Sequence, residues 1–257
     1  MSVPTVVVHR DADILAKAVA ARIITRLVDV QSAKGTASLV LTGGTVGIAT
    51  LAAIASTPAR DAVDWRRLDI WWGDERFLPD GDPERNETGA RRALLDHVDV
   101  DPERVHVMLG PDSGLTAEES ADAYATELAK AARPEDHGPS PSFDVMLLGM
   151  GPDAHVASLF PGMPALYDTR PVVAVHGAPK PPPTRISLTL PAIQASREVW
   201  VIAAGAEKAG AVRLALSESG PVQVPAAGAR GRSRSLFLLD RAAAGKIPPG
   251  LGRLASP

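Results

Sequence analysis

The stretch 147–162, "LLGMGPDAHVASLFPG", decides the class of fold. The apolar run "FDVMLLG" at 143–149 ends in a Gly-x-Gly turn and leads to two polar side chains, Asp153 and His155. A short apolar run that ends at glycine is typical of a buried strand. Polar groups directly after such a strand are typical of a parallel sheet, where ligands bind beyond the carboxyl ends of the strands. The rest of the chain is therefore expected to supply more strands of this kind.

Apolar runs and amphipathic segments alternate along the remaining sequence. Strands are predicted over 5–9, 37–42, 68–72, 104–109, 143–149, 185–190, 198–205 and 235–240, and helices over 11–30, 45–56, 86–97, 116–132 and 207–217. Thr116 and Glu119 have the spacing of a capping box. This alternation predicts an α/β fold, with a largely parallel central sheet and helices on both faces. A single domain over residues 1–257 is expected.

The composition excludes several classes of protein. Apolar residues make up 45% of the chain and the net charge is −3, which favours a soluble globular protein without a nucleic-acid or membrane surface. There is no cysteine, so disulfides and thiolate nucleophiles are excluded. The first residues lack a basic region followed by an apolar core, and we expect a cytoplasmic protein. The uncharged stretch between Lys34 and Arg60 is long enough to span a bilayer, but its central "TGGTVG" favours a strand, a loop and a helix.

Two predicted loops carry groups suited to an anion. "LVLTGGTVG" at 39–47 places Gly43, Gly44 and Thr45 before a helix, where backbone N–H groups can bind a phosphate. It lacks the Gly-Lys-Ser/Thr ending of a P-loop, and an ordinary tight turn is the alternative. "VIAAGAEKAGAV" at 201–212 places Lys208 in the first turn of a helix, as a point charge for a phosphate or as a merely solvated side chain.

Two other loops carry acid and base groups. In "WWGDERFLPDGDPERNE" at 71–87, Asp74 can orient a base and Arg76 can bind an anion, although a surface ion pair is an equal alternative. His155 beside Asp153 can take a proton from water, although a lone histidine is more often structural. "GMGPDA" fits the dinucleotide pattern only loosely, since no acidic residue ends a following strand. Neither H-E-x-x-H nor G-x-S-x-G is present, so no metal site or serine nucleophile is predicted.

Together these motifs resemble those of the 6-phosphogluconolactonase family, within the glucosamine-6-phosphate isomerase/6-phosphogluconolactonase superfamily. The matches run in order from about residue 39 to 208: Thr42-Gly43-Gly44-Thr45, Gly73-Asp74-Glu75-Arg76, Pro79, Asn86, Asp153, His155, "ASLFPG", "RISLTL" and "AGAEK". The resemblance implies the Rossmann-like fold of that superfamily, with a small additional subdomain allowed. It also implies hydrolysis of 6-phospho-D-glucono-1,5-lactone to 6-phospho-D-gluconate in the oxidative pentose phosphate pathway, without cofactor or metal.

The resemblance further implies roles for individual residues. His155 would be the general base toward water, and either Asp153 or Asp74 would orient it. Arg76 would stabilise the oxyanion or hold the phosphate. The remaining phosphate and ring contacts would come from Gly43, Gly44, Thr45 and Lys208, with Arg185 as a further candidate. The partner would be the small sugar-phosphate lactone, and a monomer or small homo-oligomer is expected.

Three positions depart from the family pattern, and two other functions stay open. Ala154 replaces a family glycine, at a cost of roughly 1–2 kcal/mol if its φ is positive. Arg85 replaces a serine, and Val46-Gly47 lacks a proline that often follows the glycine loop. One alternative is a glucosamine-6-phosphate deaminase, whose similar histidine loop continues I-A-F-N-E-P rather than "VASLFPG". The other is a non-catalytic sugar-phosphate sensor, which Ala154 favours and the acid–base groups disfavour.

Overall fold

The central sheet is built as the alternating pattern predicts. The computed structural model describes residues 1–217, 219–250 and 252–254. Its seven-stranded sheet is parallel throughout. In spatial order the strands are β10 (Gly252–Leu254), β1 (Pro4–His9), β9 (Arg234–Asp240), β8 (Glu198–Ala203), β5 (Val145–Gly149), β2 (Ala37–Leu41) and β3 (Leu68–Trp72). The α/β prediction with a largely parallel sheet is therefore confirmed.

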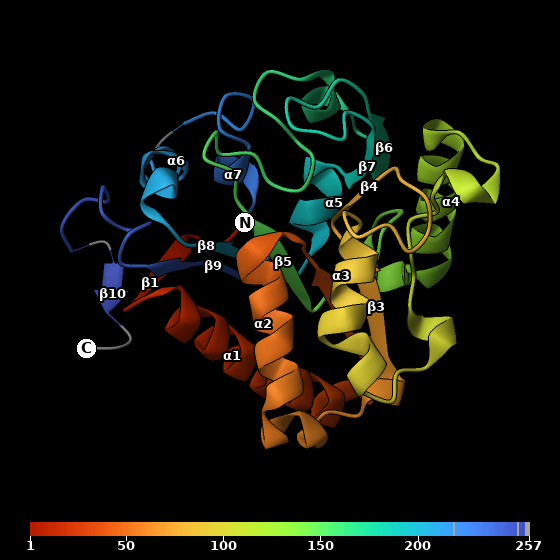
Figure 1. The fold of residues 1–257 in the computed structure, drawn as a ribbon, viewed down its shortest axis with the longest axis horizontal. Helices are drawn as coiled ribbons and strands as arrows, with labels where there is room; N and C mark the ends of the chain where they lie inside the picture. The colour runs from red at the N-terminus through yellow and green to blue at the C-terminus, as the bar shows by residue number, and fades with distance from the viewer. Residues whose placement is uncertain (218, 251, 255–257) are drawn as a thin grey trace.

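Helices cover both faces of this sheet (Figure 1). In β5, Val145 and Leu147 pack into one core and Met146 and Leu148 into the other, because successive side chains of a strand point to opposite faces. The first core lies under α1 (Ala12–Lys34), α2 (Gly44–Ser56) and α3 (Asn86–Ala93). The second lies under α4 (Ala117–Ala131), α5 (Leu190–Ala195), α6 (Ala209–Ala215) and α7 (Pro225–Gly228). The predicted capping box at Thr116 and Glu119 begins α4.

A second, smaller sheet packs into the same core as one face of the main sheet. It is antiparallel, in the order β4 (Asp74–Arg76), β7 (Arg185–Leu188) and β6 (Val172–Val175). The segment 74–76, expected to be a loop, is thus a short strand. Gly73 separates it from β3 and lets the chain pass from one sheet to the other. This places Asp74 and Arg76 at the carboxyl edge of the main sheet.

The strand predicted over 104–109 is wrong. Only Val105 bridges to Ile70 of β3, although the His106 N–H also donates to the Ile70 carbonyl at 2.9 Å. The Met108 carbonyl instead accepts a hydrogen bond from the Arg85 guanidinium at 2.8 Å. The Arg85 side chain, rather than a neighbouring strand, therefore satisfies the Met108 carbonyl. The helix predicted over 86–97 is also too long, since α3 ends at Ala93.

The uncharged stretch between Lys34 and Arg60 forms β2, the glycine loop and α2, as predicted. Within the described ranges, no helix is long and apolar enough to cross a membrane.

Candidate active site

The loop after β5 holds Asp153 and His155 in a closed turn. The Gly151 N–H donates to the His155 carbonyl at 2.9 Å, and the Ala154 N–H donates to the Gly151 carbonyl at 3.0 Å. A Cβ at Gly151 would overlap both the Asp153 and the His155 side chains, so only glycine fits there. Ala154 is buried and has a φ of 67°. The position therefore does require the left-handed region, and alanine adopts it at a cost of about 1–2 kcal/mol.

Asp153 and His155 form a hydrogen-bonded pair. Asp153 Oδ1 lies 2.5 Å from His155 Nδ1. Burial lowers the pKa of His155, while the Asp153 carboxylate opposes that shift. Burial raises the pKa of Asp153, but the neighbouring imidazole outweighs it and leaves this pKa below its usual value. With the proton on Nδ1 and donated to Asp153, Nε2 is left as the basic nitrogen near pH 7.

Asp74 lies close to this pair but does not bind it. Its buried carboxylate accepts hydrogen bonds from Ser158 Oγ at 2.7 Å and from Asn86 Nδ2 at 3.3 Å. At longer range its charge opposes the burial that lowers the pKa of His155. Of the two carboxylates considered for orienting His155, the structure therefore brings Asp153 into contact with it.

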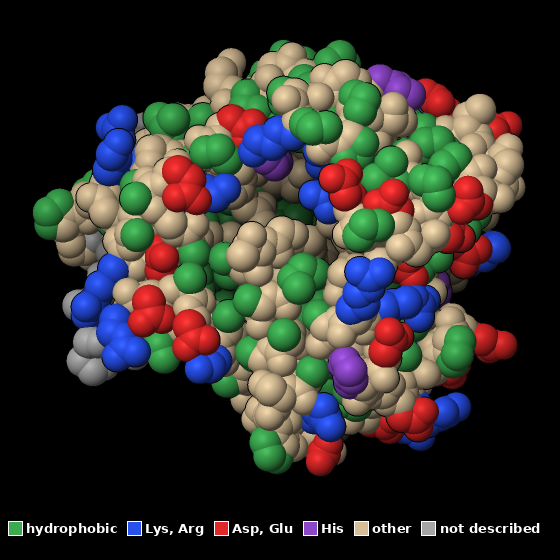
Figure 2. Space-filling view, in the orientation of Figure 1, with side chains coloured by type: hydrophobic (Ala, Val, Ile, Leu, Met, Phe, Trp, Pro, Cys, Tyr) green, Lys and Arg blue, Asp and Glu red, His purple; other side chains and the backbone are tan. Residues whose placement is uncertain are grey.

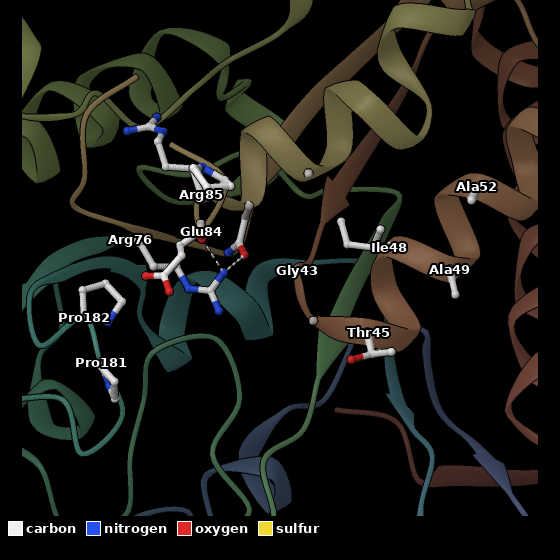
Figure 3. Close-up of a pocket in the computed structure, with 14 residues that line it drawn as sticks. Gly43, Thr45, Ile48, Ala49, Ala52, Arg76, Glu84, Arg85, Pro181 and Pro182 are labelled. Atoms are coloured by element: carbon white, nitrogen blue, oxygen red, sulfur yellow. Dashed lines mark hydrogen bonds between the residues drawn. The ribbon is translucent and has the colours of Figure 1, made fainter. Parts of the chain in front are cut away.

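Asn86 connects Asp74 to Arg76. Asn86 Oδ1 accepts a hydrogen bond from Arg76 Nη1 at 2.5 Å, and Asn86 Nδ2 donates to the Asp74 carbonyl at 2.8 Å. The same Arg76 nitrogen donates to the Glu84 carbonyl at 2.9 Å (Figure 3). The Arg76 guanidinium is thus held from two sides at the wall of the site.

The glycine loop meets this group at the start of α2. Gly43 is the N-cap residue of α2, and a Cβ there would overlap the Asn86 side chain. Gly44 has a φ of 78°, which glycine adopts without strain. Thr42 Oγ1 accepts the Gly149 N–H at 3.1 Å, which ties this loop to the end of β5.

Three basic side chains complete the site, and they are held differently. Lys208 follows β8, at the end of the short helix Ala206–Lys208, where burial and the nearby Lys180 lower its pKa. The buried Arg185 donates from Nη2 to the Lys180 carbonyl at 2.9 Å and from Nε to the Pro182 carbonyl at 3.1 Å. Arg185 therefore holds the proline-rich loop 176–185, and that loop brings Lys180 to the site.

These groups surround one cavity of about 250 Å³. All the candidate residues from the sequence line this cavity except Asp153 and Thr45. Asp153 is hydrogen-bonded to His155 but does not itself line the cavity. Thr45 instead lines two adjoining clefts at the start of α2. Figure 2 shows this face hollowed, with basic side chains at the rim of the hollow. In one adjoining cleft, Arg76, Pro181 and Pro182 face Ile48 and Ala49 of α2 (Figure 3).

The comparisons with known proteins identify the family of this chain. The family model described as glucosamine-6-phosphate isomerases/6-phosphogluconolactonase matches residues 10–238. The chain belongs to this family. A 6-phosphogluconolactonase of Streptomyces coelicolor is 62% identical, covering 96% of each chain, and one of Mycobacterium tuberculosis is 49% identical, covering 93% of this chain and 96% of its own.

Solved structures of the family share the fold. The 6-phosphogluconolactonase from Trypanosoma brucei is 30% identical, with a TM-score of 0.81 over 95% of this chain and 99% of its own. A monomeric glucosamine-6-phosphate deaminase is 21% identical, with a TM-score of 0.77 over 94% of this chain and 99% of its own, a likeness of fold alone. The cavity of this family member lies at the carboxyl ends of the parallel strands.

Sequence reasoning missed three contributors to the site. In the sequence, Asn86 is only a motif match, yet its side chain joins Arg76 to Asp74. Ser158, from "ASLFPG", is fully buried and donates to Asp74. Lys180 lies in the proline-rich loop, where no local sequence pattern indicates a binding site. Its positive charge among prolines is the one feature that could have pointed to it. In the part of the chain that the structure describes, no cluster of His, Cys, Asp or Glu side chains is arranged to hold a metal ion.

Proposed function

We propose that this chain hydrolyses 6-phospho-D-glucono-1,5-lactone to 6-phospho-D-gluconate, the lactone-opening step of the oxidative pentose phosphate pathway. The observation that carries the proposal is His155, hydrogen-bonded to Asp153, in the lining of a small cavity with Arg76, Lys180 and Lys208. A cavity of about 250 Å³ suits a substrate of one sugar ring. The names of relatives that are 49–62% identical support the same activity.

His155 is the general base of the reaction. Its Nε2 takes a proton from a water molecule as the water oxygen bonds to the lactone carbonyl carbon. The resulting oxyanion collapses, the bond from that carbon to the ring oxygen breaks, and the imidazolium returns the proton to the leaving ring oxygen. Asp153 stabilises the imidazolium between these two transfers, since its carboxylate accepts the Nδ1 proton.

The anionic substrate is held by the basic rim. Arg76 and Lys208 are the phosphate or oxyanion contacts, together with the N–H groups of the loop at Gly43, Gly44 and Thr45. Arg185 is proposed instead as the support of the loop that carries Lys180, since its Nε and Nη2 donate to the carbonyls of that loop. No cofactor enters the reaction, because lactone opening needs only water and proton transfer.

The test is the rate of lactone opening, followed by coupling the product to 6-phosphogluconate dehydrogenase, against the spontaneous rate. We expect acceleration, and a fall in kcat of about 10²–10⁴ in His155→Ala. An unchanged kcat would remove His155 from the role of base.

The same preparation separates the two alternatives. Release of ammonia from glucosamine 6-phosphate would indicate a deaminase, although "VASLFPG" after His155 argues against it. Binding of 6-phosphogluconate without lactone turnover would indicate a sensor. The presence of both Asp153 and His155 in contact favours the enzyme.

We also propose that the chain is a single α/β domain that works in the cytoplasm as a monomer or small homo-oligomer. The absence of cysteine fits a reducing compartment. Light scattering of the purified protein would give its oligomeric state.

A further inference from the structure

Glu75 is a buried acid in the middle of the "GDER" motif that the reaction above does not use. Its side chain points away from the cavity, and the residue is 1% exposed. Three backbone N–H groups donate to its carboxylate: those of Arg76 at 2.8 Å, Asn86 at 2.6 Å and Glu87 at 2.8 Å. A carboxylate that accepts three N–H groups from two elements fixes those elements relative to each other.

The contacts from Asn86 and Glu87 make Glu75 the cap of α3. These residues are in the first turn of the helix, whose N–H groups have no partner within the helix. The N-cap residue itself, Arg85, makes no side-chain cap bond. A negative carboxylate supplied from β4 takes that place, where the helix dipole favours it.

Arg85 is the residue whose positive charge acts on this carboxylate. Its guanidinium is buried and donates to the Leu78 and Met108 carbonyls at 2.9 and 2.8 Å. Burial raises the pKa of Glu75 to about 7, while the N–H donors and the Arg85 charge oppose the rise. Above pH 7, Glu75 is therefore a charged group inside the protein.

The hydrogen bonds of Glu75 also position Asn86 and Arg76, which line the cavity. Asn86, held at its N–H by Glu75, uses its side chain to hold Arg76 Nη1 at 2.5 Å. Arg76 is also held at its own N–H by Glu75. Both the backbone and the guanidinium of Arg76 thus depend on one carboxylate.

We propose that Glu75 is a positioning residue for Arg76: by capping α3 and holding the Arg76 and Asn86 N–H groups, it sets the Arg76 guanidinium at the wall of the substrate cavity. This inference rests on the proposed function, because it assigns Arg76 to the bound substrate.

The test is a double-mutant cycle with Glu75→Gln and Arg76→Met, assayed at pH 8 for kcat/KM on the lactone and for Kd with 6-phosphogluconate. Gln keeps the shape but places an amide N–H₂ against N–H donors. We expect Glu75→Gln to lower kcat/KM about tenfold, and to have less than a twofold effect when Arg76 is already Met. An equal effect in both backgrounds, or none in the wild-type background, would overturn the proposal.

A matched control separates positioning from stability. Asp144 is another buried carboxylate that accepts a backbone N–H, from Ser38 at 2.8 Å, but it lies at the opposite end of the sheet. Asp144→Asn is expected to lower Tm and leave kcat/KM unchanged. If Glu75→Gln does not fold, Glu75→Asp, which keeps the charge but shortens the reach, enters the same cycle.

The Kd arm keeps this test distinct from that of the proposed function. If the wild type does not accelerate lactone opening, the proposed function fails, and the cycle is read from Kd alone. A change in Kd that depends on Arg76 would still support the role of Glu75, and a change independent of Arg76 would refute it.

Discussion

Replacing Asp153 with asparagine tests the acid–base pair most directly. The change keeps the size of the side chain and removes the charge that lies 2.5 Å from His155 Nδ1. A hydrogen bond to a charged group contributes about 1.5–3 kcal/mol, and the Asp153 side chain is 35% exposed, so the lower half of this range applies. Losing that stabilisation of the imidazolium lowers kcat at least about tenfold. An asparagine that turns its N–H₂ toward Nδ1 would move the imidazole proton to Nε2 and deepen the loss toward about 10⁴.

The same substitution predicts the direction of a pH shift. Burial lowers the pKa of His155 and Asp153 opposes it, so removing the carboxylate lowers this pKa further. The base then stays neutral to lower pH. The acid limb of kcat/KM is therefore expected to move to lower pH in Asp153→Asn, by about one unit for each 1.4 kcal/mol of lost interaction.

The assay is kcat/KM from pH 5 to 8, with spontaneous opening subtracted in each buffer. The substrate phosphate also titrates in this pH range. Its effect on kcat/KM is the same for the wild type and for Asp153→Asn, so it cancels when the two pH profiles are compared. Asp168→Asn is the control, since Asp168 pairs with Arg170 away from the cavity, and less than a twofold change is expected. An unchanged kcat in Asp153→Asn, or an acid limb that moves to higher pH, would refute the reasoning.

Three further predictions follow from single residues. Lys208→Met is expected to raise KM about tenfold with kcat within about threefold, and an unchanged KM would place the phosphate elsewhere. Ala154→Gly relieves about 1–2 kcal/mol of backbone strain but loses a buried methyl group and gains unfolded-state entropy, so urea denaturation should show a net change within about 1 kcal/mol. Burial raises the pKa of Glu75 from 4.5 to about 7, so the folded state holds a proton that the unfolded chain releases. As pH rises from about 5 to 8, the unfolding free energy of the wild type should therefore fall by up to about 3 kcal/mol relative to that of Glu75→Gln. A rise over this range would contradict the raised pKa of Glu75.

The positions of the site loops could be predicted because they follow from local pattern. Each predicted loop comes directly after a buried apolar run, and parallel strands bring their carboxyl ends to one edge. Gly43, His155 and Lys208 lie in three such loops, and the structure places all of them around one cavity. Neither their mutual contacts nor the choice between Asp153 and Asp74 as the partner of His155 could be obtained in this way.

What the sequence could not supply depends on contacts between distant segments. The second sheet pairs residues 74–76 with residues 185–187, more than a hundred positions apart. The family resemblance makes Arg185 a candidate phosphate contact, but its Nε and Nη2 donate to the carbonyls of residues 180–182. No periodicity carries such information, since a charged side chain in a short strand has the same pattern whether it faces a ligand or a loop.

Gly151 and Ala154, the two small residues in the loop that carries His155, are under different structural constraints. At Gly151 the constraint is space: a Cβ would displace the Asp153 and His155 side chains themselves. At Ala154 the constraint is the backbone: a φ of 67° costs about 1–2 kcal/mol, and the side chain packs into the hydrophobic core. A cost of that size is tolerable within a total stability of about 5–15 kcal/mol, whereas a displaced base is not. The replacement of the family glycine at Ala154 is therefore compatible with catalysis, and it is at Gly151 that an alanine would abolish it.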